Sequence, residues 1–220
     1  LVLVAGIGCA ANVVNMYIKA DTVHVHHGRA LAYATGIKVA NPQLDIVVVS
    51  GDGDLASIGG NHLIHAARRN IDLTVICGNN FVYGTTGGHM AATTPVGGIT
   101  VTTPMGNQEP PFDLCCLVAA AGGSYVARCS VAKPKHLIHT IKKGLMHKGF
   151  SFIDTLSTCP VQFGRRNNLR TPGEMIKWLR ENSISKTKAD ALSKEELHDK
   201  WVIGEFCVDL ERTWSGYLPA

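Results

Sequence analysis

Ile46-Val-Val-Val-Ser-Gly-Asp-Gly-Asp54 and Leu73-Thr-Val-Ile-Cys-Gly-Asn-Asn80 are the two stretches that decide the fold. Each is a short apolar run, rich in β-branched residues, that ends in glycine and polar residues, as buried parallel strands often do. The residues between them, from about Ser57 to Arg69, follow a helical pattern. Strand, loop, helix and strand in this order predict one βαβ unit, whose crossover brings both polar loops to the same edge of a sheet.

The same alternation runs through most of the chain and predicts the α/β class, with a parallel sheet covered by helices on both faces. The expected strands are Leu1–Ala5, Ile46–Ser50, Leu73–Cys77, Ser124–Ala127 and Phe152–Leu156. The expected helices are Arg29–Ala40, Ser57–Arg69, Leu114–Ala121 and Lys133–Lys148. From Tyr83 to Pro111 no period is visible, so we expect a long loop, and a loop of that length in a compact domain is usually functional.

The 220 residues are enough for one domain, which we place at residues 1–170, with an extension at residues 171–220. Two capping boxes, Thr171-Pro-Gly-Glu174 and Ser193-Lys-Glu-Glu196, each predict the start of a polar helix in the extension. We expect this helical extension to pack on the domain or on a partner subunit. The chain opens without methionine inside a strand-like run, and we expect a further N-terminal segment to precede it.

The composition excludes several classes of protein. With 45% hydrophobic residues, 17% charged residues and a formal net charge of +4, the chain is typical of a globular protein, and its basic residues do not gather as in nucleic-acid-binding domains. The longest apolar run, at residues 1–14, is interrupted by glycine and asparagine, so we expect no membrane span. Seven scattered cysteines suit a reducing cytoplasm better than a disulfide framework.

Asp52 and Asn80 follow the two strands of the βαβ unit, so their side chains are expected to face the same point at the sheet edge. A carboxylate and an amide oxygen are ligands that suit Mg²⁺, which fills its other positions with phosphate oxygens and water. Gly51 and Gly53 would let backbone N–H groups approach a phosphate. A Gly-Asp-Gly triplet alone is a common turn, but with the second loop it predicts a site for a diphosphate-bearing cofactor held through a divalent cation.

Further motifs carry a resemblance to a known family. The motifs are, in chain order, His27-Gly-Arg29, Ser50-Gly-Asp-Gly53, Ile58-Gly-Gly-Asn-His62, Ala66-Ala-Arg-Arg-Asn70, Asn79-Asn80, Tyr83-Gly-Thr-Thr-Gly-Gly88 and Gly106-Asn-Gln-Glu-Pro-Pro111. From about Gly6 to Arg166 the sequence resembles the β subunit of 2-oxoacid:ferredoxin oxidoreductases, most of all the 2-oxoglutarate members. The resemblance implies the thiamine diphosphate-binding fold.

The resemblance also implies the reaction and its partners. A member of this family takes part in the coenzyme A-dependent oxidative decarboxylation of a 2-oxoacid to acyl-CoA and CO₂, with electrons passed through iron–sulfur centres to ferredoxin. Thiamine diphosphate supplies the carbanion chemistry. An α subunit, and in some cases further small subunits, completes the site, so this chain is expected to be inactive alone.

Site residues follow from the resemblance by matching motif positions. The Asp52 and Asn80 side chains and the Val82 carbonyl would hold Mg²⁺, and Gly51 and Gly53 would lie against the diphosphate. His27 would lie near the diphosphate or the reacting centre. The residues that would border cofactor and substrate are Tyr83, Gly84 and Thr86. Cys9 and Cys159 match two ligands of a [4Fe–4S] cluster, whose other two cysteines would stand in a Cys-Pro-Gly-Cys segment before Leu1.

Two positions depart from the family pattern. Gly87 stands where some members have a lysine that would pair with a substrate carboxylate, and His89 stands where glutamine is common. We expect His89 or a residue of the partner subunit to take that role.

The sequence leaves alternatives to the 2-oxoglutarate reaction. They are the same reaction on pyruvate or on a branched 2-oxoacid, a non-redox thiamine-dependent decarboxylase or synthase, or a non-catalytic nucleotide-binding module.

The remaining cysteines and histidines have simpler interpretations. A zinc pair at His24 and His26 is conceivable, but no other Cys or His stands at the spacing of a structural zinc site. The cysteines expected to be small buried apolar residues are Cys77, Cys115, Cys116 and Cys129.

Overall fold

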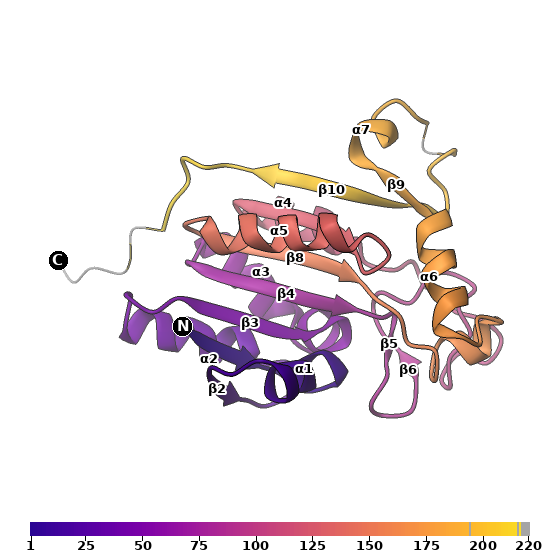
Figure 1. Ribbon diagram of the computed structural model, residues 1–220, viewed down its shortest axis with the longest axis horizontal. Helices are drawn as coiled ribbons and strands as arrows, with labels where there is room; N and C mark the ends of the chain where they lie inside the picture. The colour runs from indigo at the N-terminus through magenta and orange to yellow at the C-terminus, as the bar shows by residue number, and fades with distance from the viewer. Residues whose placement is uncertain (194, 215, 217–220) are drawn as a thin grey trace.

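In the computed structural model, which describes residues 1–193, 195–214 and 216, eight strands form one sheet in the order β2-β1-β3-β4-β8-β7-β10-β9 (Figure 1). The strands are β1 (Val2–Ala5), β2 (Asp21–His24), β3 (Ile46–Gly51), β4 (Leu73–Asn79), β7 (Tyr125–Ser130), β8 (Phe150–Leu156), β9 (Ser183–Ser185) and β10 (Trp201–Val208). Neighbours from β2 to β7 are parallel, and β10 runs antiparallel to β7. The predicted parallel α/β sheet is therefore confirmed.

Helices cover both faces of the sheet, as expected from the alternating pattern (Figure 1). They are α1 (Cys9–Tyr17), α2 (Ala30–Ala40), α3 (Gly60–Arg69), α4 (Leu114–Ala121), α5 (Pro134–Met146), α6 (Pro172–Glu181) and α7 (Lys186–Ala189). A π-helical turn, Gly53–Ile58, joins β3 to α3. Among the described residues, no helix has the length and apolar character that a membrane span requires.

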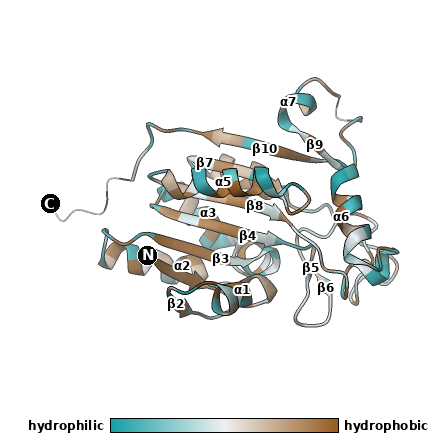
Figure 2. Cartoon of the chain, in the orientation of Figure 1, coloured by the Kyte–Doolittle hydropathy of each residue, from teal (hydrophilic) through white to brown (hydrophobic). Residues whose placement is uncertain are grey.

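The strand residues alternate between two apolar layers, which explains why their β-branched runs are continuous. Val4, Val48 and Val75 pack in the large core cluster with residues of α2, α3 and α4. Leu3 and Val47 point to the other side, where they pack with residues of α1. In Figure 2 the central strands are correspondingly brown over most of their length and paler or teal toward their carboxyl ends.

The carboxyl ends of β3 and β4 lie side by side, with Gly51 opposite Gly78 in the strand register. The chain leaves β4 into the short hairpin of β5 (Val82–Tyr83) and β6 (His89–Met90), and then into the largely irregular segment predicted up to Pro111. Below this edge α6 closes a second core cluster, in which Met175 and Leu179 pack with Phe81. The edge is therefore built on a packed base.

The extension at residues 171–220 differs in part from the prediction. Its first capping box forms as expected and opens α6, with the Thr171 hydroxyl and the Glu174 side chain bonded to each other's backbone N–H groups. The second box also forms its two hydrogen bonds, from Ser193 to Glu196, but residues 195–199 are turns rather than a helix. The prediction of a helical extension is therefore wrong in part, because Trp201–Val208 forms a strand, which pairs with β9 through residues 201–203 and with β7 from Gly204 onward.

At the opposite edge of the sheet a buried ion pair joins α2 to the start of β4. The Lys38 ammonium is 2% exposed, lies 2.7 Å from Asp72 Oδ2 and donates to the Leu44 carbonyl at 2.8 Å. A buried ammonium needs such partners, because desolvation otherwise removes its charge. This pair lies before β4 begins, at the opposite end of the strand from the Asn79-Asn80 turn.

Candidate functional site

A small cavity of about 70 Å³ lies at the carboxyl edge, between the loop after β3, the loop after β4 and the start of α1. Its walls hold nearly all of the residues singled out by the sequence, and its complete lining is Ile7, Gly8, Cys9, Ala10, His27, Gly51, Asp52, Gly53, Asp54, Asn80, Val82, Tyr83, Gly84, Thr85 and Thr86. The predicted convergence of the Asp52 and Asn80 loops is thus present in the structure.

Asp52 is the buried carboxylate of this cavity, with 1% of its surface exposed. Burial raises the pKa of this carboxyl to about 6. Three hydrogen bonds lower the pKa and oppose this effect: one from the Thr93 hydroxyl to Oδ2, and two from the backbone N–H groups of Asn80 and Gly53. Burial disfavours the charged form of a carboxylate unless a cation or further donors compensate. The cavity therefore contains an acidic group whose charge a bound cation would stabilise.

The turn after β4 places Asn80 and Val82 on the cavity wall. The Asn80 Oδ1 atom accepts a hydrogen bond from the Val82 N–H at 3.3 Å, and the Asn79 Oδ1 atom accepts one from the Phe81 N–H at 3.4 Å. Phe81 has a φ of 68°, a left-handed conformation that a bulky residue adopts only when its surroundings impose it. The buried Phe81 ring and the two asparagine bonds hold this turn in place.

Asp54 organises the opposite wall and is 2% exposed. Its Oδ1 accepts from the Gly28 N–H at 2.7 Å and the Ile7 N–H at 3.3 Å, while Oδ2 accepts from the Ser50 hydroxyl at 2.6 Å. The Nδ1 atom of His27 lies 2.5 Å from Asp54 Oδ1, which is an ion pair when the imidazole is protonated, and it makes no hydrogen bond among the described residues. Asp54 thus ties three segments of the chain together beside His27.

Tyr83 packs across the floor of the cavity. Its ring lies 5.9 Å from the His27 ring, centroid to centroid. A Cβ atom on Gly53 would come within 2.5 Å of the Tyr83 ring, whereas a Cβ atom on Gly51 would meet only the Gly78 carbonyl, at 3.9 Å. Gly53 is therefore required by the packing of Tyr83, whereas no close contact with another described residue requires Gly51.

The two candidate cluster ligands come together at Gly84. The Cys9 sulfur lies 3.5 Å and the Cys159 sulfur 3.6 Å from the position that a Cβ atom on Gly84 would occupy. Cys9 is exposed and Cys159 is half-buried, so neither sulfur is enclosed in the core. Two thiols that are far apart in the sequence therefore face one small region beside the cavity.

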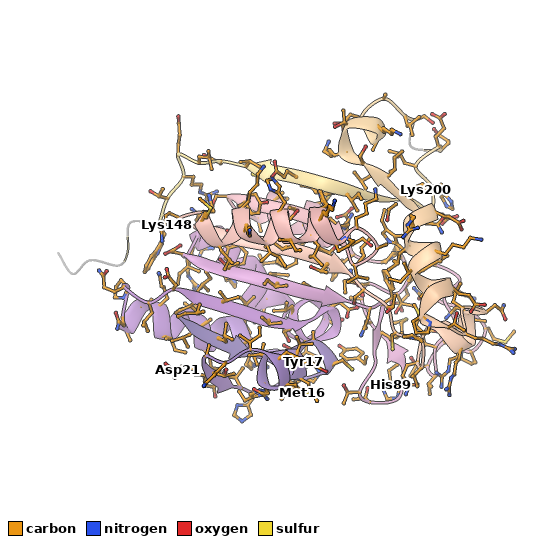
Figure 3. All side chains as sticks on the ribbon, viewed as in Figure 1. Met16, Tyr17, Asp21, His89, Lys148 and Lys200 are labelled. Atoms are coloured by element: carbon orange, nitrogen blue, oxygen red, sulfur yellow. The ribbon has the colours of Figure 1, made fainter. Side chains whose placement is uncertain are left out.

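Other predicted positions do not line the cavity, although His89 contacts Thr86, which does. His89 stands on the exposed β5–β6 hairpin, where its Nδ1 atom is 3.4 Å from the Thr86 hydroxyl (Figure 3). Cys77, Cys115 and Cys129 are buried as expected, but the expectation for Cys116 is wrong, because it lies on the outer side of α4 and is exposed.

Three features of the cavity were not predicted from the sequence. The first is the wall at Ile7 and Gly8, which the apolar run at residues 1–14 concealed, although the glycines around Ile7 were an available signal. The second is the role of Asp54, which the sequence shows only as part of the Gly-Asp-Gly-Asp loop. The third is the contact of Thr93 with Asp52, because Thr93 stands in an irregular segment without a sequence pattern.

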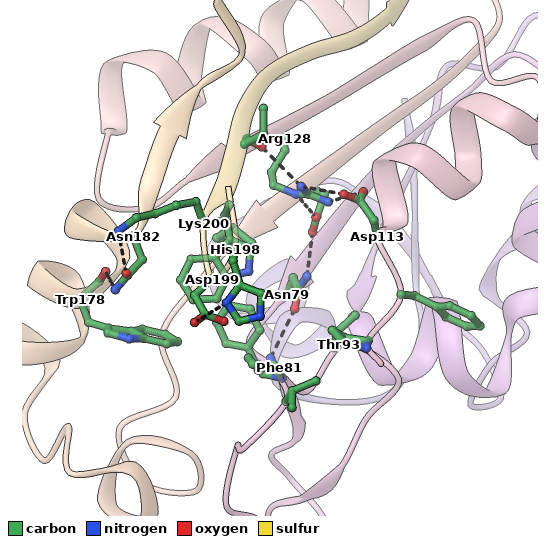
Figure 4. Close-up of a pocket in the computed structure, with 18 residues that line it drawn as sticks. Asn79, Phe81, Thr93, Asp113, Arg128, Trp178, Asn182, His198, Asp199 and Lys200 are labelled. Carbon is green, nitrogen blue, oxygen red and sulfur yellow. Dashed lines mark hydrogen bonds and ion pairs between the residues drawn. The ribbon is translucent and has the colours of Figure 1, made fainter. Parts of the chain in front are cut away.

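A larger cavity of about 630 Å³ lies behind the turn after β4. Asn79, Thr93 and Arg128 are among its lining residues, together with Trp178 and Trp201 from the extension (Figure 4). Both residues also adjoin the small cavity, because Asn79 precedes Asn80 in the chain and the Thr93 hydroxyl donates to Asp52.

Comparison with known proteins gives consistent matches. Residues 6–155 match the family model for the C-terminal thiamine pyrophosphate-binding domain of thiamine pyrophosphate enzymes. The chain is 54% identical over 206 residues to the 2-oxoglutarate synthase subunit KorB of Methanothermobacter marburgensis. The aligned region covers 94% of this chain and 72% of that protein. It is 53% identical over 211 residues to the subunit of the same name from Methanocaldococcus jannaschii, covering 96% and 77%.

A solved structure is similar along nearly the whole chain. The 2-oxoglutarate:ferredoxin oxidoreductase from Magnetococcus marinus, determined with 2-oxoglutarate, coenzyme A and succinyl-CoA bound, aligns with a TM-score of 0.84 at 29% identity. The alignment covers 97% of this chain and 73% of that one.

The two glycines of the loop after β3 are predicted to respond differently to one added methyl group. Gly53→Ala should lower the free energy of unfolding by about 1–3 kcal/mol, because the Tyr83 ring must move. Gly51→Ala should change it by less than about 0.5 kcal/mol, since no atom is displaced. Urea unfolding without cofactor measures both, and equal losses would contradict the described packing.

Proposed function

We propose that this chain holds thiamine diphosphate through a divalent cation in the small cavity. The chain belongs to the thiamine pyrophosphate enzymes and, within them, to the β subunits of the 2-oxoglutarate:ferredoxin oxidoreductases. Family membership confirms the enzyme class and the fold expected from the sequence. The observation that carries the proposal is the buried Asp52 carboxylate, which shares the cavity wall with Asn80 and Val82.

The proposed reaction is the coenzyme A-dependent oxidative decarboxylation of 2-oxoglutarate to an acyl-CoA and CO₂, with electrons passed to ferredoxin. Thiamine diphosphate, when bound, supplies the carbanion chemistry. Curated relatives are named as subunits, and we propose that an α subunit completes the site over the cavity. All seven cysteines are free, which suits a reducing cytoplasm.

The donor set of the cavity fits a hard divalent cation. Mg²⁺ prefers oxygen ligands, and it is commonly bound through one or two carboxylates together with substrate phosphates. In this proposal the Asp52 carboxylate, the Asn80 amide oxygen and the Val82 carbonyl hold Mg²⁺. Gly51 and Gly53 present backbone without side chains to the diphosphate, and the room above Gly51 agrees with that role.

The residues around the cation have supporting roles in the proposal. His27, with an Nδ1 atom that lacks a hydrogen-bond partner among the described residues, lies near the diphosphate or the reacting centre. Tyr83, Gly84 and Thr86 border the cofactor and the substrate, because all three line the cavity. Asp54 fixes the wall on which His27 stands.

We further propose that Cys9 and Cys159 are ligands of a [4Fe–4S] cluster. The support is their approach to the same point beside Gly84. Four thiolates are the usual ligand set of such a cluster. In this assignment the other two thiolates would come from a Cys-Pro-Gly-Cys segment like that of the family, which is not among these 220 residues.

Substrate and reaction class can be tested together in the enzyme assembled with its partner subunits. The expected result is coenzyme A-dependent reduction of a viologen dye with 2-oxoglutarate, and little with pyruvate or a branched 2-oxoacid. Faster reduction with one of the other acids would overturn the substrate. Thiamine-dependent CO₂ release without dye reduction would instead support a non-redox decarboxylase or synthase.

Asp52→Ala should weaken thiamine diphosphate binding more than about 100-fold, beyond the usual cost of losing an outer-shell partner of a metal. The folded state should lose little stability without cofactor, because removal of a carboxylate that burial disfavours offsets the loss of its hydrogen bonds with Thr93, Asn80 and Gly53. Equilibrium dialysis with Mg²⁺ and thermal unfolding measure the two effects. An unchanged affinity for thiamine diphosphate would refute the assignment of Asp52 as a metal ligand.

The cluster proposal predicts iron content in the full-length subunit. Cys9→Ser and Cys159→Ser should each lower bound iron and brown absorbance substantially, because each removes one of the four thiolates. Cys116→Ser is the matched control, since this thiol is also outside the core but lies on α4. Equal iron in all three variants would show that neither Cys9 nor Cys159 is a ligand.

A further inference from the structure

A buried network of charged side chains crosses the carboxyl ends of three strands. Arg128 on β7 is 5% exposed, and its Nε atom donates to Asp154 Oδ2 on β8 at 2.7 Å. The other Asp154 oxygen, Oδ1, accepts from Asn79 Nδ2 at the end of β4 at 3.1 Å. Figure 4 shows the chain of contacts that runs from Arg128 to the turn after β4.

The far side of Arg128 is also fixed. Its Nη2 atom donates to Asp113 Oδ1 at 2.7 Å, and its Nη1 atom lies 3.4 Å from both Asp113 Oδ2 and the Val202 carbonyl. The guanidinium lies over the Phe206 ring, 5.2 Å from its centroid. Asp113 in turn caps α4 by accepting from the Cys116 N–H. These partners accept hydrogen bonds from all three guanidinium nitrogens. The Arg128 donors are therefore engaged within the protein rather than directed at a ligand in the larger cavity.

Asn79 connects this network to the proposed metal site. Its Oδ1 atom holds the Phe81 N–H at 3.4 Å, and its own carbonyl accepts from the Ser157 N–H at 2.7 Å. Phe81 is the left-handed residue of the turn, with a φ of 68°. Asn80 stands directly between Asn79 and Phe81, so the direction of the Asn80 side chain depends on how firmly both neighbours are held.

We propose that Arg128 is a positioning residue for the cation site, which acts through Asp154 and Asn79 to hold the turn that presents Asn80 and the Val82 carbonyl to the small cavity. The inference rests on the proposed function, because it assigns Asn80 and Val82 to the metal. The family resemblance gives a role to the Asn79-Asn80 loop but none to Arg128, Asp154 or Asp113.

Simple electrostatics predicts the opposite sign, which makes the proposal testable. Removing a positive charge near a cation site would tighten cation binding by Coulomb's law alone. Removing a positioning residue loosens the ligand geometry, and loss of an outer-shell partner typically weakens metal affinity 10–100-fold. The direction of the change in Mg²⁺ affinity therefore separates the two effects.

The test uses the enzyme assembled with its partner subunits, stripped of metal with a chelator. Equilibrium dialysis of thiamine diphosphate against increasing Mg²⁺ gives the half-saturating Mg²⁺ concentration. Arg128→Met is expected to raise that concentration several-fold, by less than the roughly tenfold or more that loss of a direct partner of a metal ligand costs. An unchanged or lower concentration would overturn the proposal.

A matched control separates positioning from general loss of stability. Lys38→Met breaks a different ion pair with a buried cation, that between Lys38 and Asp72 at the opposite edge of the sheet. It is expected to lower thermal stability as Arg128→Met does, but to leave the half-saturating Mg²⁺ concentration unchanged. An equal rise in both variants would show that Arg128 acts only through stability and would refute the proposal.

Double variants test the route of the effect. If Arg128 acts through Asn79, then Arg128→Met should add little to Asn79→Ala, because the link is already broken. Arg128→Met and Thr93→Val should instead combine nearly additively, since Thr93 contacts Asp52. Full additivity with Asn79→Ala would refute the proposed route.

The outcome for Asp52→Ala keeps this inference distinguishable from the proposed function. If Asp52→Ala abolishes Mg²⁺-dependent binding and Arg128→Met has no effect, only the positioning role fails. If Asp52→Ala leaves binding intact, the metal site itself is wrong, and the positioning role fails with it.

Discussion

The structure depends on one constraint, which is that a carboxylate buried at the end of a strand must meet a compensating charge or donor. Asp52 is 1% exposed, and the two loops, the hairpin and the Thr93 segment are arranged around it. Parallel pairing of β3 with β4 makes this possible, because it places Gly51 opposite Gly78 and brings Asn80 to the same edge. The remaining parts of the site follow from that register.

The support of this edge comes from segments that are distant in sequence. Asp54 ties the loop after β3 to Gly28 and Ile7, while Asn79 and Asp154 tie the turn after β4 to β8 and β7. The extension contributes Trp178 and Trp201, which pack against Phe81 beneath the turn. A site that looks like two short loops in the sequence is therefore held by most of the sheet.

The sequence predicted the central βαβ unit because its signals are local: apolar runs that end in Gly-Asp-Gly and Asn-Asn leave few alternatives. It did not predict α1, because the apolar run at residues 1–14 masks the change from strand to helix at Gly8. It also did not predict β10, whose pairing with β7 is long-range and follows a capping box that indicates a helix. Arg128, Asp154 and Thr93 carry no sequence signal, since only tertiary packing brings them beside Asn79 and Asp52.

The most direct measurement of the central claim is a crystal structure of the assembled enzyme with thiamine diphosphate and Mn²⁺, which replaces Mg²⁺ and scatters anomalously. We expect one anomalous peak within coordination distance of the Asp52 carboxylate, the Asn80 amide oxygen and the Val82 carbonyl, with the diphosphate beside Gly51. Thiamine diphosphate bound with its cation at a different set of ligands would contradict the account.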